Sequence, residues 1–581
     1  MRVARIALAQ INTTVGDLEG NATIIRQRLQ EARDEGCDLV AFPEMAVTGY
    51  PPEDLLLRRS FCSASREILD SLVPATSGIT AIIGFVDWRD GEARNSAAIA
   101  ADGRLVDIYD KIRLPNYGVF DEDRYFTAGS RVPVYRAGGL RFGVGICEDI
   151  WYPGHPLEDI SLAGAELYIN INASPYHLGR SADRERMLAT RAADNLVTVA
   201  YLNAVGGQDE LVFDGGSVVF DASADLVARA PQYSEDLLVV DIDLDAVSQR
   251  RLHDPRWRIE RRERAYVAID EVLDIGVEPS LARELPLHQP KTGLMGPEEE
   301  VWNALVVGTR DYLGKTGFRE ALIGLSGGLD SAVVAAVAVD ALGAENVAGV
   351  AMPSRYSSQH SLDDARALAK NLGIRLLTIP IEPAHAAMLE MLASAFEGTE
   401  PGTAEENLQS RQRGNVLMTL SNKFGSLVLT TGNKSEMATG YATLYGDMAG
   451  GFAVIKDVPK TMIYRLSRWR NEQAGRDLIP ESIVTKPPSA ELKPDQLDSD
   501  FLPEYEILDP ILQAYVEEDR TFDEIVAAGF DPDVVRKVIR LVDRNEYKRR
   551  QAPPGVKITR RAFGRDRRLP LANRFSSFPA G

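Results

Sequence analysis

The feature that most constrains the fold is a short apolar run leading directly into a glycine-rich loop. Residues 321–323 read Ala-Leu-Ile, and residues 324–332 read Gly-Leu-Ser-Gly-Gly-Leu-Asp-Ser-Ala. The run predicts a buried strand, and the Ala- and Val-rich segment from Ser331 to Leu342 predicts a helix after the loop. A strand, a tight loop and a helix in this order are typical of a doubly wound α/β domain, in which ligands bind where strands end.

The residue types in this loop favour a phosphate ligand. Ser326, Gly327 and Gly328 lack bulky side chains, so backbone N–H groups can close on a phosphate while the helix directs its positive N-terminus at the anion. The loop is not a Walker P-loop, because Asp330 stands where that motif needs a lysine. A carboxylate there suits a magnesium-bridged pyrophosphate better than a transferred γ-phosphate. We therefore expect ATP to be cleaved at this loop.

Composition limits the possible partners. The chain has 581 residues, enough for more than one domain, and its net charge of −20 disfavours a nucleic-acid partner. No apolar run approaches the ~20 residues of a membrane span, the N-terminus shows no cleavage site, and three cysteines do not make a disulfide framework, so we expect a cytoplasmic protein. Between Arg536 and Arg574, 14 Lys or Arg stand against three Asp or Glu. This segment indicates either a basic surface for a phosphate-bearing ligand or an acidic subunit, or a solvated face.

The pattern of apolar segments changes along the chain. Residues 1–270 carry many short β-rich segments with intervening helices, which predicts an α/β domain dominated by strands. Residues 271–297 concentrate proline and glycine and read as a linker. In residues 298–581 strands alternate with longer helices, as in a doubly wound parallel sheet.

Three chemically matched side chains follow apolar strands in the N-terminal half. Glu44 stands in Phe-Pro-Glu-Met, Lys111 in Tyr-Asp-Lys-Ile, and Cys147 in Gly-Ile-Cys-Glu-Asp. Taken singly, Glu44 also fits a surface acid and Cys147 a buried small hydrophobe. Together they supply a base, a cation for an oxyanion and a nucleophile, which is a complete set for amide hydrolysis. The six histidines show no clear metal-ligand spacing, which argues against a metallohydrolase.

These N-terminal motifs resemble the Glu-Lys-Cys triad of the nitrilase or carbon-nitrogen hydrolase superfamily, whose fold is an α-β-β-α sandwich. The resemblance covers most of residues 1–260 and implies a glutaminase, with Glu122 as a fourth polar group beside the triad. It also implies that Tyr117, Ser174 and Arg180 hold glutamine, since Arg180 can pair with the α-carboxylate of that amino acid.

The C-terminal loop resembles the Ser-Gly-Gly-x-Asp-Ser loop of the ATP pyrophosphatases, which have a Rossmann-like fold and adenylylate a substrate oxygen. A nitrilase-like domain followed by such a domain resembles the bacterial glutamine-dependent NAD synthetase family nearly end to end. That resemblance implies that nicotinic acid adenine dinucleotide is amidated to NAD with glutamine-derived ammonia, passed internally between the two sites. It further implies ATP and Mg²⁺ without a redox cofactor, and a homo-oligomer.

The same resemblance implies the contacts of the synthetase site. For ATP the residues are Gly324, Leu325, Ser326, Gly327, Gly328, Leu329, Asp330, Ser331, Thr431, Lys460 and Ser489. For the dinucleotide they are Asn407, Glu436, Tyr441, Ala442, Thr443, Leu444 and Lys548, and for magnesium Asp330 and Glu436. Ammonia-only synthetases have lysine where Leu444 stands, so the nicotinate end of the substrate is read differently here.

Three other functions compete with this one. A nitrilase-type hydrolase with a silent C-terminal half is disfavoured by the intact loop from Ser326 to Ser331 and by Glu436. A pyrophosphatase-type RNA-modifying enzyme is disfavoured by the acidic charge, the fused glutaminase and the absence of Cys-x-x-Cys pairs. An amidotransferase acting on another acid stays open, because the loop and the triad do not identify the acceptor.

Overall fold

The computed structural model describes residues 2–263, 272–276, 281, 283, 285–489, 491–493 and 496–575. The chain divides into two compact units: Met1–Gln208 with Val212–Met295, and Asp209–Leu211 with Gly296–Gly581. Parts of the expected linker lie outside the described residues, namely 271, 277–280, 282 and 284. No helix among the described residues is long and apolar enough to cross a membrane.

The first unit contains two large sheets. One sheet has the order β14-β1-β2-β3-β4-β5 and the other β13-β12-β9-β8-β7-β6-β15. The strands of the first sheet are β1 (Val3–Gln10), β2 (Leu39–Ala41), β3 (Thr80–Arg89), β4 (Glu92–Ala101), β5 (Arg104–Asp110) and β14 (Asp236–Asp243). Those of the second are β6 (Val134–Ala137), β7 (Leu140–Ile146), β8 (Leu167–Asn172), β9 (Thr198–Asn203), β12 (Val218–Phe220), β13 (Leu226–Arg229) and β15 (Val272–Asp274). Strands β10 (Val205–Gln208) and β11 (Leu211–Asp214) form a separate pair.

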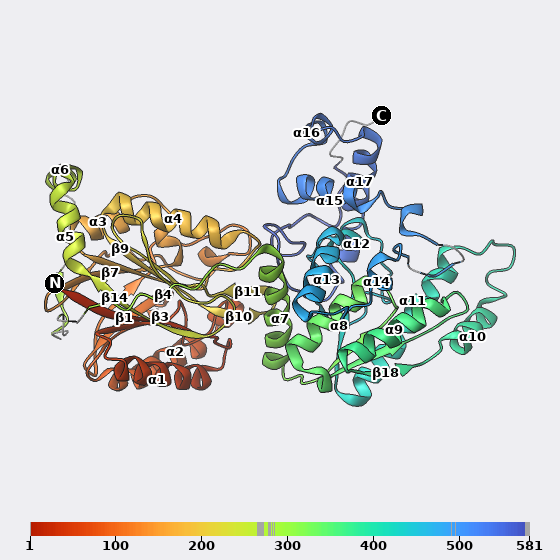
Figure 1. The fold of residues 1–581 in the computed structure, drawn as a ribbon, viewed down its shortest axis with the longest axis horizontal. Coiled ribbons are helices and arrows are strands. Elements are labelled where there is room, and N and C mark those ends of the chain that lie inside the picture. Colours follow the sequence, from red (N-terminus) through yellow and green to blue (C-terminus); the bar gives the residue numbers. More distant parts are fainter. Residues whose placement is uncertain are drawn as a thin grey trace. The chain divides into compact units, whose positions relative to one another are not determined.

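Helices cover the outer faces of both sheets in this unit (Figure 1). The helices are α1 (Leu18–Asp34), α2 (Arg59–Leu72), α3 (Leu157–Leu162), α4 (Arg180–Asn195), α5 (Leu244–His253) and α6 (Pro255–Glu263). Apolar residues of α1 and α2 pack on one face of the first sheet, and those of α3 and α4 pack on the second sheet. Between the sheets, Ile6 and Leu8 of β1 pack with Val144 of β7 and Ile169 of β8. The predicted α-β-β-α sandwich is therefore confirmed.

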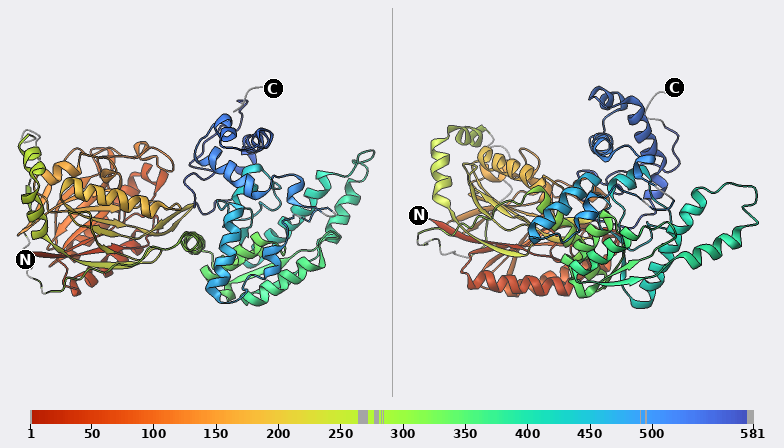
Figure 2. Two further views of the ribbon diagram at one scale, coloured as in Figure 1. Left: turned by 45° about the horizontal axis from the view of Figure 1, so that its top comes forward. Right: turned by 45° about the vertical axis from the view of Figure 1, so that its right-hand side comes forward.

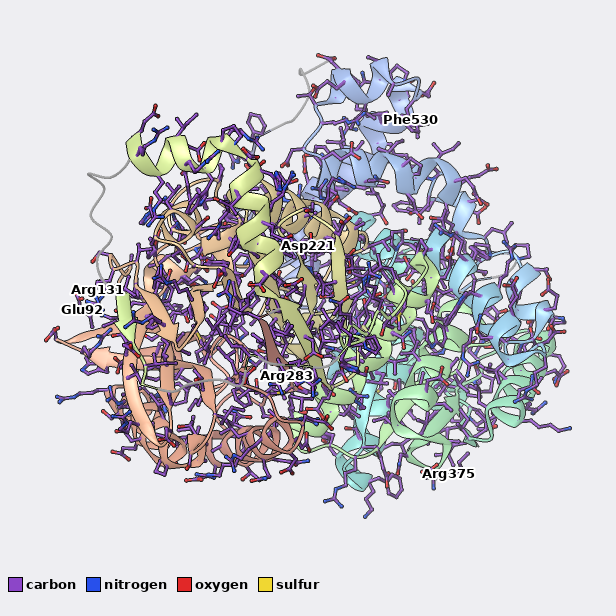
Figure 3. All side chains as sticks on the ribbon, turned by 60° about the vertical axis from the view of Figure 1, so that its left-hand side comes forward. Glu92, Arg131, Asp221, Arg283, Arg375 and Phe530 are labelled. Atoms are coloured by element: carbon purple, nitrogen blue, oxygen red, sulfur yellow. The ribbon has the colours of Figure 1, made fainter. Side chains whose placement is uncertain are left out.

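Some charged side chains of this unit are exposed, as those of Glu92 and Arg131 illustrate (Figure 3). Strands β8 and β9, by contrast, are buried throughout, and β1 is buried apart from Arg5. Such runs are typical of strands that have apolar layers on both sides.

The second unit is built on a parallel sheet with the strand order β18-β17-β16-β19-β20. This unit is the part of the ribbon coloured from green to blue in Figure 2. The strands are β16 (Ala321–Gly324), β17 (Val347–Ala351), β18 (Arg375–Thr378), β19 (Leu427–Thr430) and β20 (Phe452–Ala453). Its helices are α7 (Pro297–Thr316), α8 (Leu329–Leu342), α9 (Gln359–Leu372), α10 (Glu382–Leu392), α11 (Thr403–Phe424), α12 (Lys434–Thr439), α13 (Lys460–Ala474), α14 (Glu481–Thr485), α15 (Tyr505–Leu512), α16 (Phe522–Ala527), α17 (Pro532–Arg544) and α18 (Glu546–Arg549). Because the first strand is central and the order reverses beside it, the ends of β16 and β19 form the crevice where doubly wound folds bind ligands.

Candidate functional site

The three side chains of the predicted triad meet at one end of the first unit. Glu44 follows β2, Lys111 follows β5, and Cys147 follows β7, so the two sheets contribute to one site. The Lys111 ammonium donates to Glu44 Oε1 at 2.8 Å, and neither side chain is exposed to solvent. Cys147 is also buried, and its thiol interacts electrostatically with both of them. The structure thus brings together three groups that are far apart in the sequence.

Lys111 lies between two carboxylates. Its Nζ atom contacts Glu122 Oε1 at 2.9 Å as well as Glu44. Burial alone would lower the pKa of Lys111, but Glu122 and Glu44 raise it well above its ordinary value. The ammonium therefore stays charged and can stabilise a developing oxyanion.

The Glu44 carboxylate is held by two further donors. Asn95 Nδ2 donates to Glu44 Oε1 at 2.7 Å, and the backbone N–H of Ala173 donates to Oε2 at 3.0 Å. Neither residue was predicted from the sequence, because Asn95 lies within β4 and Ala173 acts through its backbone. These contacts fix the orientation of a carboxylate that is suited to a general base.

Cys147 occupies a strained turn. This turn begins directly after β7, and the φ of Cys147, +44°, is in the left-handed region that non-glycine residues rarely adopt. Burial and the Glu44 carboxylate raise the pKa of Cys147 well above its ordinary value, while Lys111 opposes this rise. The thiol is therefore neutral until a base removes its proton, a task that the geometry gives to Glu44.

Asp149 connects the turns that carry Lys111 and Cys147. Its Oδ1 atom accepts the N–H groups of Ile112 at 3.1 Å and Arg113 at 2.8 Å. Its Oδ2 atom accepts the N–H of Ile146 at 2.9 Å and the hydroxyl of Tyr109 at 2.8 Å. The carboxylate is completely buried, and its hydrogen bonds hold the turn that carries Lys111 and the turn that carries Cys147 in position relative to each other.

The residues expected to hold glutamine lie close to the triad. The hydroxyl of Tyr117 donates to Glu148 at 3.0 Å, and the Arg180 guanidinium lies 4.0 Å from the centre of the Trp151 ring. Burial raises the pKa of Glu148, while Tyr117 and Arg180 lower it. Ser174 is buried two residues after the end of β8. The site therefore presents both a cation and a carboxylate, which suits the zwitterionic end of an amino acid.

The glycine loop of the second unit is closely packed. Gly327 has a φ of +79°, and a Cβ atom there would lie 2.3 Å from the carbonyl oxygen of Ser361. The hydroxyl of Ser326 accepts the N–H of Gly328 at 3.2 Å and lies 3.2 Å from the hydroxyl of Ser331. Helix α8 begins at Leu329, two residues earlier than the predicted Ser331. The loop thus turns directly into a helix N-terminus, as phosphate binding requires.

Asp330 is the centre of a charged group beside this loop. Lys460, the first residue of α13, donates to Asp330 Oδ2 at 2.6 Å, and Asn433 Nδ2 donates to the same oxygen at 3.4 Å. Removal from solvent and the Asp330 charge raise the pKa of Glu436 well above its ordinary value. Asn433 caps α12 and exchanges hydrogen bonds with Glu436. The predicted Asp330, Glu436 and Lys460 therefore lie together, and Asn433 was missed although it lies within the same motif.

The donor set fits a magnesium ion that is bound together with phosphate. Asp330 Oδ1 is buried and has no hydrogen-bond partner. Among the described residues no three His, Cys, Asp or Glu side chains form a metal cluster by themselves. Mg²⁺ commonly takes one or two carboxylates and completes its shell with phosphate oxygens and water. Asp330 and Glu436 match this arrangement.

The residues expected to contact the dinucleotide form a second cluster in this unit. The hydroxyl of Thr443 donates to Asn407 Oδ1 at 2.8 Å, and Lys548 Nζ donates to the carbonyl oxygens of Gly440 at 2.7 Å and Ala442 at 2.8 Å. The carbonyl of Leu444 accepts from Arg411, and the hydroxyl of Tyr441 accepts from Gln496. Two residues expected to contact ATP lie elsewhere in this unit. Thr431 directly follows β19, and the Ser489 hydroxyl accepts the N–H of Glu491 at 3.1 Å.

The basic character of the C-terminal segment is only partly a surface property. Arg549, Lys557 and Arg567 are buried, and the first two donate to backbone carbonyls. These three residues therefore contribute neither to the expected local basic surface nor to its alternative, a solvated face, because they are buried inside the unit.

Comparisons with known proteins cover both units. The NAD synthase family model matches residues 301–552, and the carbon-nitrogen hydrolase model matches residues 5–252. Glutamine-dependent NAD(+) synthetases from Thermotoga maritima and Aquifex aeolicus are 51% and 46% identical to this chain. The first match covers 99% of both chains, and the second covers 98% of this chain and 99% of the relative.

A solved structure is similar over the whole length. It is the glutamine-dependent NAD+ synthetase from Acinetobacter baumannii in complex with adenosine diphosphate, with 38% identity, a TM-score of 0.74 and complete coverage of both chains. Together with the two family models, these matches confirm the predicted resemblance, and this chain belongs to the glutamine-dependent NAD(+) synthetase family.

Proposed function

We propose that this protein amidates nicotinic acid adenine dinucleotide to NAD, using ATP and glutamine and releasing AMP, pyrophosphate and glutamate. The observation that carries the proposal is the presence, in one chain, of a buried Lys111 bound to Glu44 beside Cys147 and of a glycine loop beside Asp330 and Lys460. The first set suits release of ammonia from an amide, and the second suits activation of a carboxylate. The reaction changes no oxidation state and needs no redox cofactor, nucleic acid or membrane.

In the proposed glutaminase step, Glu44 takes the proton of Cys147 as the sulfur attacks the amide carbon of glutamine. The Lys111 ammonium stabilises the negative oxygen of the tetrahedral intermediate. Glu44 then gives its proton to the departing nitrogen, so ammonia leaves and a thioester forms. Water, deprotonated by Glu44, hydrolyses the thioester to glutamate and restores the thiol.

In the proposed synthetase step, a carboxylate oxygen of the dinucleotide attacks the α-phosphorus of ATP, and pyrophosphate leaves. Residues 324–331 hold the phosphates through backbone N–H groups, and Lys460 adds a positive charge. A magnesium ion held by Asp330 and Glu436 would neutralise the charge of the leaving group. Ammonia then attacks the activated carboxyl carbon, and AMP leaves.

The remaining site assignments are parts of this proposal. Glutamine is held by Tyr117, Ser174 and Arg180. Further ATP contacts come from Thr431 and Ser489, and the dinucleotide is held by Asn407, residues 441–444 and Lys548. We also propose a cytoplasmic homo-oligomer in which ammonia passes internally between the sites.

A product assay tests the proposal. Purified protein with ATP, Mg²⁺ and the dinucleotide should form NAD, AMP and pyrophosphate from either glutamine or ammonia. Cys147→Ala should lose the glutamine-supported reaction and keep the ammonia-supported one, whereas Cys62→Ala, at a buried cysteine of α2, should keep both. Formation of ADP and phosphate by the parent enzyme would contradict the function assigned to the glycine loop.

A further inference from the structure

Helix α12 is too short to hold its own orientation. It has six residues, and isolated helices of this length are not stable in water, so its position depends on tertiary contacts. Its first turn carries Glu436, and its cap Asn433 contacts Asp330. Whatever holds α12 therefore also sets the geometry of the charged group beside the glycine loop.

Four polar contacts of α12 are made by a residue that the reaction does not use. Lys434 is buried, and its ammonium lies 2.7 Å from Glu517 Oε1, 3.0 Å from Asp457 Oδ1 and 2.6 Å from the hydroxyl oxygen of Thr559. It also donates to the carbonyl oxygen of Arg561 at 3.2 Å. Two of its four acceptors belong to the C-terminal segment of residues 556–567.

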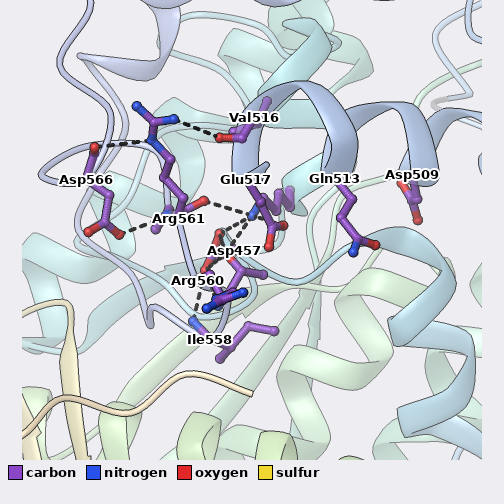
Figure 4. A network of polar contacts seen from close by, with 12 residues as sticks. Asp457, Asp509, Gln513, Val516, Glu517, Ile558, Arg560, Arg561 and Asp566 are labelled. Carbon is purple, nitrogen blue, oxygen red and sulfur yellow. Dashed lines mark hydrogen bonds and ion pairs between the residues drawn. The ribbon is translucent and has the colours of Figure 1, made fainter. Parts of the chain in front are cut away.

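This C-terminal segment is fixed to the same group. Asp457 accepts the N–H groups of Ile558 at 2.9 Å and Thr559 at 2.8 Å, and it accepts the Thr559 hydroxyl at 2.7 Å. Figure 4 shows the contact between Ile558 and Asp457, with Glu517 and Arg561 in the same network. Burial would raise the pKa of Asp457, but Lys434 and Lys557 lower it below its ordinary value. The carboxylate therefore stays charged and joins the segment to Lys434.

The other end of α12 is held by the same part of the chain. The Arg549 guanidinium donates to the carbonyl oxygens of Ala438 at 2.6 Å and Met437 at 3.3 Å. Asn545 Nδ2 donates to the carbonyl of Thr439 at 2.8 Å. Residues after α17 thus cap the end of α12 while residues 556–567 hold its beginning.

We propose that Lys434 is a positioning residue through which residues 556–567 hold the first turn of α12, and with it Glu436, in place beside Asp330. This inference rests on the proposed function only in the activity it affects, since the contacts themselves do not depend on the substrate. A purely structural salt bridge would stabilise the unit as a whole. Lys434 instead directly follows in the chain the cap Asn433, which contacts Asp330, and precedes Glu436 by two residues in the same first turn.

Substitution of Thr559 tests the positioning role of Lys434 without removing a charge from the protein. Thr559→Val keeps the shape but removes the group that accepts from Lys434 and donates to Asp457. Thr559→Ser keeps the hydroxyl. Thr309→Val is the matched control, because the Thr309 hydroxyl is buried in the same unit and has no hydrogen-bond partner.

The first measurement is amide hydrogen exchange of residues 434–439 in the nucleotide-free protein. Thr559→Val should speed this exchange, while Thr559→Ser and Thr309→Val should match the parent. The second measurement is kcat of ammonia-supported synthesis, which should fall about tenfold to a hundredfold in Thr559→Val, because displacement of a catalytic group by ~1 Å costs that much. Glutamate release without ATP should stay unchanged.

Two results would overturn the proposal. One is parent-like exchange in α12 of Thr559→Val, and the other is an equal effect of Thr559→Ser. If the parent makes no NAD at all, the proposed function fails, but the exchange measurement still decides whether the segment positions α12.

Discussion

Asp149→Asn is expected to disable the glutaminase while leaving the rest of the enzyme intact. In its most favourable orientation the amide oxygen replaces Oδ1 and still accepts from Ile112 and Arg113. The NH₂ group then replaces Oδ2, where the Tyr109 hydroxyl can rotate to accept from it. The N–H of Ile146 has no such option and is left facing another donor.

The magnitude follows from that one lost bond. A buried donor without a partner costs about 1–3 kcal/mol, so Asp149→Asn should still fold. The strain falls on the residue directly before Cys147, and a displacement of the thiol by ~1 Å would lower kcat about a hundredfold. We therefore expect glutamate release to fall by about that factor, with ammonia-supported synthesis within about twofold of the parent.

The assay compares glutamate release, ammonia-supported synthesis and urea unfolding in the same preparations. Asp241→Asn is the matched control, because Asp241 is also buried and accepts from Arg5 and from the N–H of His288, away from the triad. It should be destabilised comparably but keep its glutaminase kcat. Parent-like glutaminase activity in Asp149→Asn, or an equal loss in Asp241→Asn, would refute the positioning role.

Lys111→Met should abolish glutamate release and lower the free energy of unfolding by about 3–5 kcal/mol, because Glu44 and Glu122 lose their shared cation. Burial already raises the pKa of Glu122 to about 7, and loss of Lys111, which lowers that pKa, should raise it further. The destabilisation relative to the parent should therefore grow as the pH rises above about 7 in urea titrations, and a loss that does not change with pH would contradict it. Gly327→Ala should remove synthesis from both nitrogen sources, since its Cβ would meet the Ser361 carbonyl, whereas Gly314→Ala in open space on α7 should not. The rate at which iodoacetamide alkylates Cys147 should keep rising with pH up to and beyond pH 9.0, the ordinary pKa of a cysteine thiol. A plateau of this rate below pH 9.0 would show that the pKa of Cys147 is not raised.

The sequence was sufficient to predict which side chains lie together when those side chains follow the ends of strands. Glu44, Lys111 and Cys147 could be grouped because strand ends in a layered domain meet at one edge, and Asp330 because its loop follows the first strand of a doubly wound sheet. The family and both folds followed from the motifs around these residues. The roles of the individual residues stay predictions until variants are measured.

The residues that hold the catalytic groups in position could not be predicted from the sequence in this way. Asn95 and Asp149 act through contacts between different strands, and Lys434 acts through a segment more than a hundred residues away in the chain. No local spacing encodes such pairings, because a buried Asn or Lys looks the same in sequence whether its partner is water or a carboxylate. The short strand β15 was likewise missed, since three residues in a Pro- and Gly-rich region carry no periodicity.

The position of β1 in its sheet has a consequence for synthesis of the protein on the ribosome. Strand β1 pairs along its whole length with β14, so Val3 faces Asp243 and Gln10 faces Asp236. At roughly 5–20 residues per second, the ribosome needs on the order of 10–50 s to make the chain between these strands. During that time the first strand has an open hydrogen-bonding edge, which is the kind of edge that pairs with other nascent chains. We therefore expect that protection of this edge by chaperones until β14 has emerged raises the yield of folded protein.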